Sequence, residues 1–198
     1  MLASVQSMGL AGVEGYKVTV EAVCTAGMPM YELVGLPDAA VKESRERVRA
    51  AMASCQMLFP VARLTLNLAP ADTKKEGPAF DLPIALAIMA SSGMLDPDAF
   101  EGMAAVGELS LTGSVVGVRG ALSMAISARE QGIRALLMPA DNAKEAACVE
   151  GLDVLPVRHL QEAIDHLRGK KRIMPEKTVP YQQMMKARQP ASDFADVR

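Results

Sequence analysis

Aromatic residues are scarce in this sequence: tryptophan is absent, and only 4% of the 198 residues are aromatic. This scarcity argues against a binding module built on aromatic side chains. Half of the residues are hydrophobic, and 14 of the 198 are methionine. Valine, leucine, isoleucine, alanine and methionine must therefore fill the interior, which favours helices packed on a sheet. A chain of this length can bury one good core, with at most a small appendage.

Cysteine is also rare, and long apolar runs are missing. Cys24, Cys55 and Cys148 are odd in number, far apart and in no Cys-x-x-Cys spacing. This pattern predicts reduced, mostly buried thiols rather than a disulfide framework. No apolar run has the length of a transmembrane helix, and no signal-peptide pattern is found. We expect a cytoplasmic protein without a membrane partner.

Motifs for nucleotide and metal binding are missing as well. No G-x-x-x-x-G-K-[ST] pattern occurs, and Gly169-Lys170-Lys171 lacks both the upstream glycine and the hydroxyl of a P-loop. His159 and His166 are seven residues apart on one expected helix, with no further ligands nearby, which predicts surface histidines and no metal site. Three glycines spaced by three indicate a hairpin turn: Gly9, Gly12 and Gly15.

Charge is distributed unevenly along the chain. The net charge is −2, but residues 168–198 contain eight Lys or Arg and three Asp or Glu, so this tail carries +5 and the remainder −7. The tail is polar and contains proline, which indicates a linker or arm. The expected helix 38–54 has a heavily charged face, typical of a solvated surface, with a partner or nucleic-acid contact as the alternative.

Hydrophobic periodicity predicts an α/β fold. The order of elements, strands first and then a β-α-β-α run, favours a two-layer domain with a mixed sheet. Strands are expected at residues 2–11, 16–24, 30–35, 63–68, 104–109, 113–118, 135–138 and 154–156. Helices are expected at residues 38–54, from about 84 to 93, and at 120–132, 140–149 and 158–167.

One stretch organises the rest, the loop Thr73–Pro83 that leads into the apolar run Ile84–Ala90. This run is too short to span a membrane and apolar on every side, so it predicts a helix buried in the core. The first N–H groups of such a helix point, unsatisfied, into the loop, where they can hold an anion or serve a nucleophile. The residue after Pro78 is Ala79, which has no reactive atom. Asp81 is interpreted as an N-cap rather than an acid catalyst.

Three segments of the chain resemble the N-terminal domain of the Mg-chelatase-related AAA+ ATPases, the YifB/ComM group. The resemblance covers residues 1–168, and its segments agree in order and spacing: Val34–Ala50, Asn67–Asp72 with Lys75–Pro83, and Gly107–Gly113. It implies a fold like ribosomal protein S5 domain 2 and the proteolytic domain of Lon, a mixed sheet with helices on one side. Asp193–Arg198 resembles the segment before the ATPase module of that family.

The resemblance also implies a function. The chain would be a non-catalytic N-terminal domain (1–168) with a basic linker (169–198), leading to an ATPase module that binds ATP and Mg²⁺. The intact protein would be a hexamer similar to the ATP-driven helicases that promote DNA branch migration in natural transformation. A protein-binding or chaperone-like adaptor domain is the alternative, and a Lon-like Ser-Lys peptidase is a third.

The peptidase alternative can be tested residue by residue. The resemblance places Lon's nucleophilic serine at Ala79 and its lysine base at Leu122, nine residues after Gly113, with Arg119 the nearest cation. Alanine cannot attack a carbonyl, leucine cannot accept a proton, and a guanidinium stays protonated. We therefore expect no catalytic residue in this chain.

Two basic groups remain as candidates for contacts with branched or single-stranded DNA, or with another partner. For the first, Lys74 and Lys75, a solvated loop is the alternative. For the second, a solubilising linker is the alternative: Arg168, Lys170, Lys171 and Arg172. Aromatic side chains for base stacking are nearly absent from the tail, where only Tyr181 and Phe194 occur. Any DNA binding should be weak and should fall steeply with salt.

Overall fold

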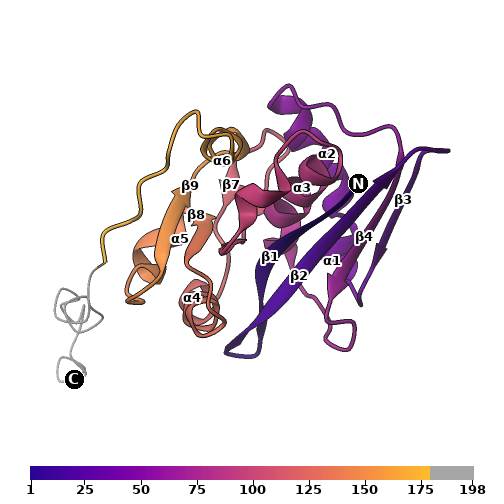
Figure 1. The fold of residues 1–198 in the computed structure, drawn as a ribbon. Coiled ribbons are helices and arrows are strands. Elements are labelled where there is room, and N and C mark those ends of the chain that lie inside the picture. Colours follow the sequence, from indigo (N-terminus) through magenta and orange to yellow (C-terminus); the bar gives the residue numbers. More distant parts are fainter. Residues whose placement is uncertain (179–198) are drawn as a thin grey trace, which may run out of the picture.

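The computed structural model describes residues 1–178. Its main feature is a seven-stranded mixed sheet with the order β3-β4-β2-β1-β5-β8-β9 (Figure 1). The strands are β1 (Leu2–Ala11), β2 (Glu14–Thr25), β3 (Met30–Val34), β4 (Arg63–Ala69), β5 (Met103–Ala105), β8 (Ala135–Pro139) and β9 (Asp153–Val157). Two short strands form a separate antiparallel pair, β6 (Glu108–Leu109) and β7 (Val115–Val116).

The hairpin β1-β2 forms the centre of the sheet. Gly12, at a φ of +62°, makes the turn between these strands, as predicted from the glycine spacing. Alternate residues on the two strands face the same core: Val5 lies opposite Val20, and Ala3 lies opposite Ala22. This period of two explains why the strands were evident in the sequence.

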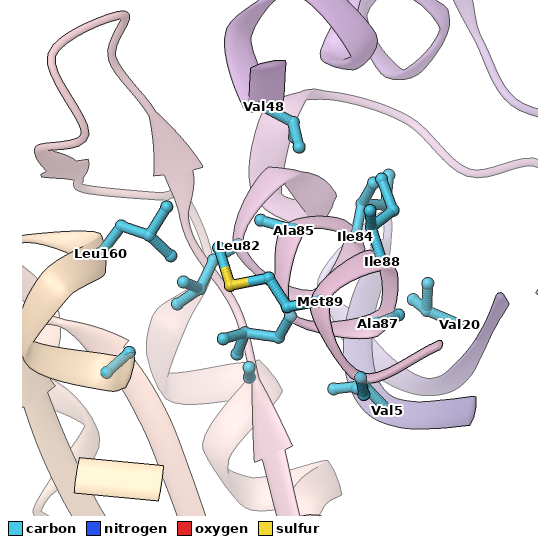
Figure 2. Close-up of a cluster of buried hydrophobic side chains, with 14 of the residues drawn as sticks. Val5, Val20, Val48, Leu82, Ile84, Ala85, Ala87, Ile88, Met89 and Leu160 are labelled. Atoms are coloured by element: carbon cyan, nitrogen blue, oxygen red, sulfur yellow. The ribbon is translucent and has the colours of Figure 1, made fainter. Parts of the chain in front are cut away.

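Helix α3 (Asp81–Ser91) is buried along its whole length, as predicted. Figure 2 shows its side chains surrounded by those of four other elements. Ala87 faces Val5 and Val20 of the hairpin, and the other labelled neighbours come from α2 (Ser44–Ser54) and α6 (Leu160–Leu167). A helix without a polar face needs cover on all sides, and here the sheet and the two helices provide it.

The opposite face of the sheet is covered over part of its width. Leu137 of β8 packs in the α3 core, whereas Leu136 and Met138 pack in a second core with Met124 and Ala125 of α4 (Ala121–Glu130). Helix α5 (Ala140–Ala146) contributes to the same second core. The α/β class and the mixed sheet are confirmed. The expected placement of helices on one side needs correction, because α4 and α5 cover the second face.

The remaining elements are short, and some boundaries differ from the predicted ones. They are α1 (Ala39–Lys42) and the 3₁₀ helices η1 (Pro78–Phe80) and η2 (Pro97–Phe100). The helix predicted at 38–54 is divided at Glu43 into α1 and α2. Across residues 1–178, no helix has both the length and the apolar character needed to cross a bilayer. The predictions for Tyr181, Phe194 and Asp193–Arg198 lie outside the described residues.

Candidate functional site: the loop before helix α3

The organising loop enters α3 through η1, and Ala79 lies in that short turn. The Ala79 side chain is only 7% exposed and borders a cavity of about 450 Å³. The backbone around it is bonded to the segment after β5: Gly107 N donates to Ala79 O at 2.8 Å, and Leu82 N donates to Gly107 O at 3.0 Å. The prediction of unsatisfied N–H groups was wrong for Leu82, because the Gly107 carbonyl occupies that place.

The cavity beside Ala79 contains little chemistry. Its charged side chains come from Glu76, Glu108 and Arg119, and the rest of its wall is glycine or apolar. Among the described residues that line it, none has a hydroxyl, a thiol or an amine. Leu122 does not line this cavity and borders a separate surface hollow on α4 with Ile126. Of the two residues considered for the base, Arg119 lines the same cavity as Ala79, and Leu122 does not.

Asp81 is an ion-pair partner, so the prediction of an N-cap was wrong. Its carboxylate is fully buried, and it accepts hydrogen bonds from Arg47 Nε at 2.6 Å and Arg47 Nη2 at 2.9 Å. Leu109 N donates to it at 3.2 Å. Burial raises the pKa of the Asp81 carboxyl, although the Arg47 guanidinium opposes this, and the carboxylate in turn raises the pKa of Arg47. One carboxylate therefore joins α2, α3 and β6.

Lys75 holds the loop together from inside. The side chain is fully buried, and its ammonium donates to the carbonyl of Pro70 and to Thr73 O, the latter at 2.7 Å. Burial lowers the pKa of the Lys75 ammonium. The prediction that Lys75 contacts DNA or a partner is therefore corrected, since its charge faces the protein. Lys74, the other predicted contact in this loop, is exposed and pairs with Glu76 at 2.8 Å.

Asp38 connects the loop to the neighbouring helix. One carboxylate oxygen caps α1 by accepting from Val41 N at 2.8 Å, and the other accepts from Gly77 N at 3.0 Å. The sequence placed Asp38 at a helix start but contained no signal for the bond to Gly77. Nor did it distinguish Arg47 among the charged residues of α2, because its partner Asp81 lies 34 residues away.

The predicted basic cluster lies at the end of α6 and just after it. Arg168 is partly engaged, since its guanidinium donates to Met94 O at 2.9 Å. Lys170, Lys171 and Arg172 are exposed, and no ion pair to them is found within residues 1–178. These three side chains are thus available to solvent. Whether they contact DNA stays a prediction.

Both histidines serve the fold. His159 caps α6, where its Nδ1 accepts from Gln161 N at 3.1 Å, and its Nε2 lies 2.8 Å from Thr112 O. His166 Nδ1 accepts from Ile173 N at 2.9 Å. No group of three or more potential metal ligands occurs in the part of the chain that the structure describes.

Comparison with known proteins identifies the family of the chain. The family model for subunit ChlI of Mg-chelatase matches residues 20–142, more than half of the chain. This chain belongs to that family. The ChlI-family chain is 40% identical to the uncharacterized protein YifB of Escherichia coli (strain K12) over 169 residues, 85% of the chain and 33% of the relative.

Two further relatives are a competence protein and a Lon protease homolog. It is 40% identical to the competence protein ComM of Haemophilus influenzae over 172 residues, 87% of the chain and 34% of ComM. It is 31% identical to the mitochondrial Lon protease homolog of Bos taurus over 117 residues, 57% of the chain and 12% of that protein. The chain thus spans about a third of the length of YifB and ComM. The predicted resemblance to the YifB/ComM group, with its Lon-like domain, is confirmed.

Proposed function

We propose that this chain is the non-catalytic N-terminal domain of a Mg-chelatase-like AAA+ ATPase of the YifB/ComM type. In the intact protein, a module beyond the described residues binds ATP and Mg²⁺ and assembles a hexamer in the cytoplasm. ATP hydrolysis there drives branch migration of DNA during recombination. The domain described here organises the subunits or guides branched or single-stranded DNA toward the ring.

The observation that carries this proposal is the Ala79 cavity. A Ser-Lys dyad needs a hydroxyl and an amine that can lose its proton, and the cavity wall among residues 1–178 contains neither. The Lon-like part of the chain therefore supports a role in binding or assembly better than hydrolysis. The 40% identity with a competence protein supports DNA as the substrate of the whole machine.

The test compares the intact protein with a version that lacks residues 1–168. Both are assayed for ATP hydrolysis and for movement of a synthetic four-way DNA junction, with reactions without ATP as controls. We expect the intact protein to move the junction in the presence of ATP. The shortened protein should hydrolyse ATP but lose most junction movement. An intact protein that hydrolyses ATP and leaves the junction in place would defeat the proposal.

A protein-binding adaptor is the second candidate, and the same cavity favours it. About 450 Å³ of open space is lined by Leu10, Val118 and Met124 as well as by charged groups, which suits an apolar side chain of a client protein. Val118→Trp should fill this space. If the adaptor function holds, the variant loses affinity for a chemically unfolded protein and keeps its affinity for DNA.

A further inference from the structure

A surface at the β3 edge of the sheet combines exposed apolar side chains with arginines. Met28, Leu58 and Val61 are 87%, 83% and 85% exposed, although large aliphatic side chains normally lose most of their surface on folding. They adjoin or line a cavity of about 190 Å³, whose wall also includes Met30 and Phe59. Such a group of exposed side chains around a hollow is typical of a site that another molecule covers.

The rim of this cavity is basic. Arg45 and Arg49 lie one turn apart on α2, and both line the cavity. The Arg45 guanidinium lies 5.3 Å from the centre of the Tyr31 ring. Arg49 has no ion pair within the described residues, and Arg45 has only the exposed Glu46 at 3.9 Å, so their charges are poorly compensated. The surface therefore attracts carboxylates.

The backbone of β3 is open on one side. Within residues 1–178, this strand pairs only with β4 and forms the outer edge of the sheet (Figure 1). Met30 N donates to Ala62 O at 3.3 Å, so the amide groups that alternate with it, those of Tyr31 and Leu33, point away from β4. An edge of this kind can pair with an added extended segment.

We propose that this surface, the β3 edge with the Arg45–Arg49 rim, binds an extended segment of a different protein by strand addition. Apolar side chains of the segment occupy the hollow between Met30 and Val61, and its carboxylates face the arginines. Self-pairing is disfavoured because two copies would bring both arginine pairs to one interface. Single-stranded DNA suits the surface less, since the Tyr31 and Phe59 rings are half-buried against each other, 6.4 Å apart, and not free to stack on bases. This inference does not depend on the proposed DNA function.

The test selects ligands for the 198-residue chain from a display library of random dodecapeptides. Binding of the enriched peptides is then measured by fluorescence anisotropy, with oligothymidine as a competitor. The test variant is R45E/R49E, and both of its changes lie on exposed positions. The matched control is K17E/K144E, which changes the net charge equally at exposed positions of β2 and α5 that do not line the cavity. Peptides N-methylated at alternate amides test the strand pairing.

We expect enriched peptides in which apolar residues alternate with Asp or Glu. Their affinity should fall about tenfold or more in R45E/R49E, stay unchanged in K17E/K144E, and disappear on N-methylation. Enrichment of basic peptides, or of none, overturns the proposal. So does an equal loss of affinity in both variants, displacement by oligothymidine, or a dimer of the chain that R45E/R49E dissociates.

Discussion

A methyl group stands where the Lon resemblance places a nucleophile, and a second apolar side chain stands where it places the base. Ala79 lines the cavity, while Leu122 borders a different hollow. Restoring one partner of a catalytic pair does not restore the other, because the nucleophile needs a base within hydrogen-bond reach. A single substitution in this cavity would therefore not create a peptidase site, because both a nucleophile and a base are missing.

Replacement of Ala79 with serine should leave the chain without peptidase activity. The new hydroxyl finds no amine or imidazole among the described residues of the cavity wall, so it stays protonated and unreactive. Fluorescent casein measures the hydrolysis, with the unmodified chain as control. Labelling of the A79S variant by a serine-directed fluorophosphonate, together with cleavage of casein, would contradict this prediction and revive the peptidase alternative.

Lys75 and Lys74 are neighbours in sequence, but replacing Lys75 should lower stability much more than replacing Lys74. Lys75→Met removes the donor to the Pro70 and Thr73 carbonyls, so the free energy of unfolding should fall by about 1–3 kcal/mol. Lys74→Met removes only an exposed ammonium and serves as the matched control. Urea denaturation followed by circular dichroism measures both variants. Equal stability of the two would show that the buried ammonium does not hold the loop.

At the scale of elements, the packing of α2 on α3 combines apolar contacts with one buried ion pair. Figure 2 shows Val48 of α2 above Ala85 of α3. At the end of the same contact, Arg47 donates to Asp81 and also to Ala40 O at 2.8 Å, so it connects α1, α2 and α3. Removing one partner of a buried pair costs more than the pair contributes, since the other charge stays behind.

Replacement of Arg47 with methionine should lower the free energy of unfolding by about 3–5 kcal/mol at neutral pH. Burial raises the Asp81 pKa, and the loss of Arg47 removes the main opposing influence. A carboxyl with a raised pKa stabilises the folded state at low pH, and this contribution is lost as pH rises through the folded pKa. The deficit should therefore shrink as pH falls toward about 4, the ordinary Asp value. Urea unfolding at several pH values, with Arg49→Met as control, measures this; a deficit independent of pH would contradict it.

The segment after α6 is attached to the domain through His166. Nδ1 of this ring accepts from Ile173 N, and Glu176 N donates to Val154 O at 2.8 Å. Burial lowers the pKa of the His166 imidazole, and the Arg172 charge lowers it further. The neutral ring is thus the form that the folded protein favours, so this contact is kept above the ordinary pKa of about 6.5 and lost as pH falls through the lower folded value.

Hydrogen exchange should detect the release of this segment in acid. Protonated Nδ1 becomes a donor, so the Ile173 amide should lose its protection, relative to its intrinsic exchange rate, as the pH falls below the ordinary histidine pKa of about 6.5 and through the lower folded pKa. His166→Asn keeps an acceptor oxygen that does not titrate in this range, and its protection should not change with pH. Loss of protection in both proteins at the same pH would show that another group controls the attachment.

At the scale of the whole molecule, the chain consists of two regions of opposite net charge. The first 167 residues carry −7 and the remainder carries +5. Because an acidic domain repels phosphate, we propose that any contact with DNA is made by the exposed cluster Lys170, Lys171 and Arg172. Affinity that depends on so few cations is governed by the release of counterions from DNA.

Replacement of these three residues with alanine should weaken binding to branched DNA and reduce its salt dependence. The slope of log affinity against log salt should become less steep by about 0.7–0.9 for each lost phosphate contact. The matched control replaces three exposed lysines of the acidic domain with alanine: Lys17, Lys42 and Lys144. Fluorescence anisotropy at several salt concentrations measures both. A slope that is the same in the two variants would favour the solubilising-linker alternative.

The hydrophobic periodicity of the sequence predicted most helices and strands. It did not predict the contacts between residues that are distant in the sequence. The alternation in β2 and the apolar run of α3 each specify their own burial, so both were predicted correctly. Two boundaries differed from the predicted ones: α3 starts at Asp81, and the helix predicted at 38–54 is divided at Glu43 into α1 and α2. Arg47 of α2 bonds to residues beside both boundaries, Ala40 and Asp81. Lys75 gave no sign of its burial, because a lysine in a charged loop is normally solvated. Local pattern carries no information on such pairings.

The order of the strands places the two edges of the sheet, and therefore two possible contact surfaces, far apart. β3 and β9 are at opposite margins of the sheet, and the chain runs beside β9 as it leaves α6. The described part of the chain thus ends beside the β9 margin, and the whole width of the sheet separates this end from the β3 margin. A partner segment bound at β3 and a module that follows the segment beside β9 would therefore use different surfaces of the domain and would not compete for binding.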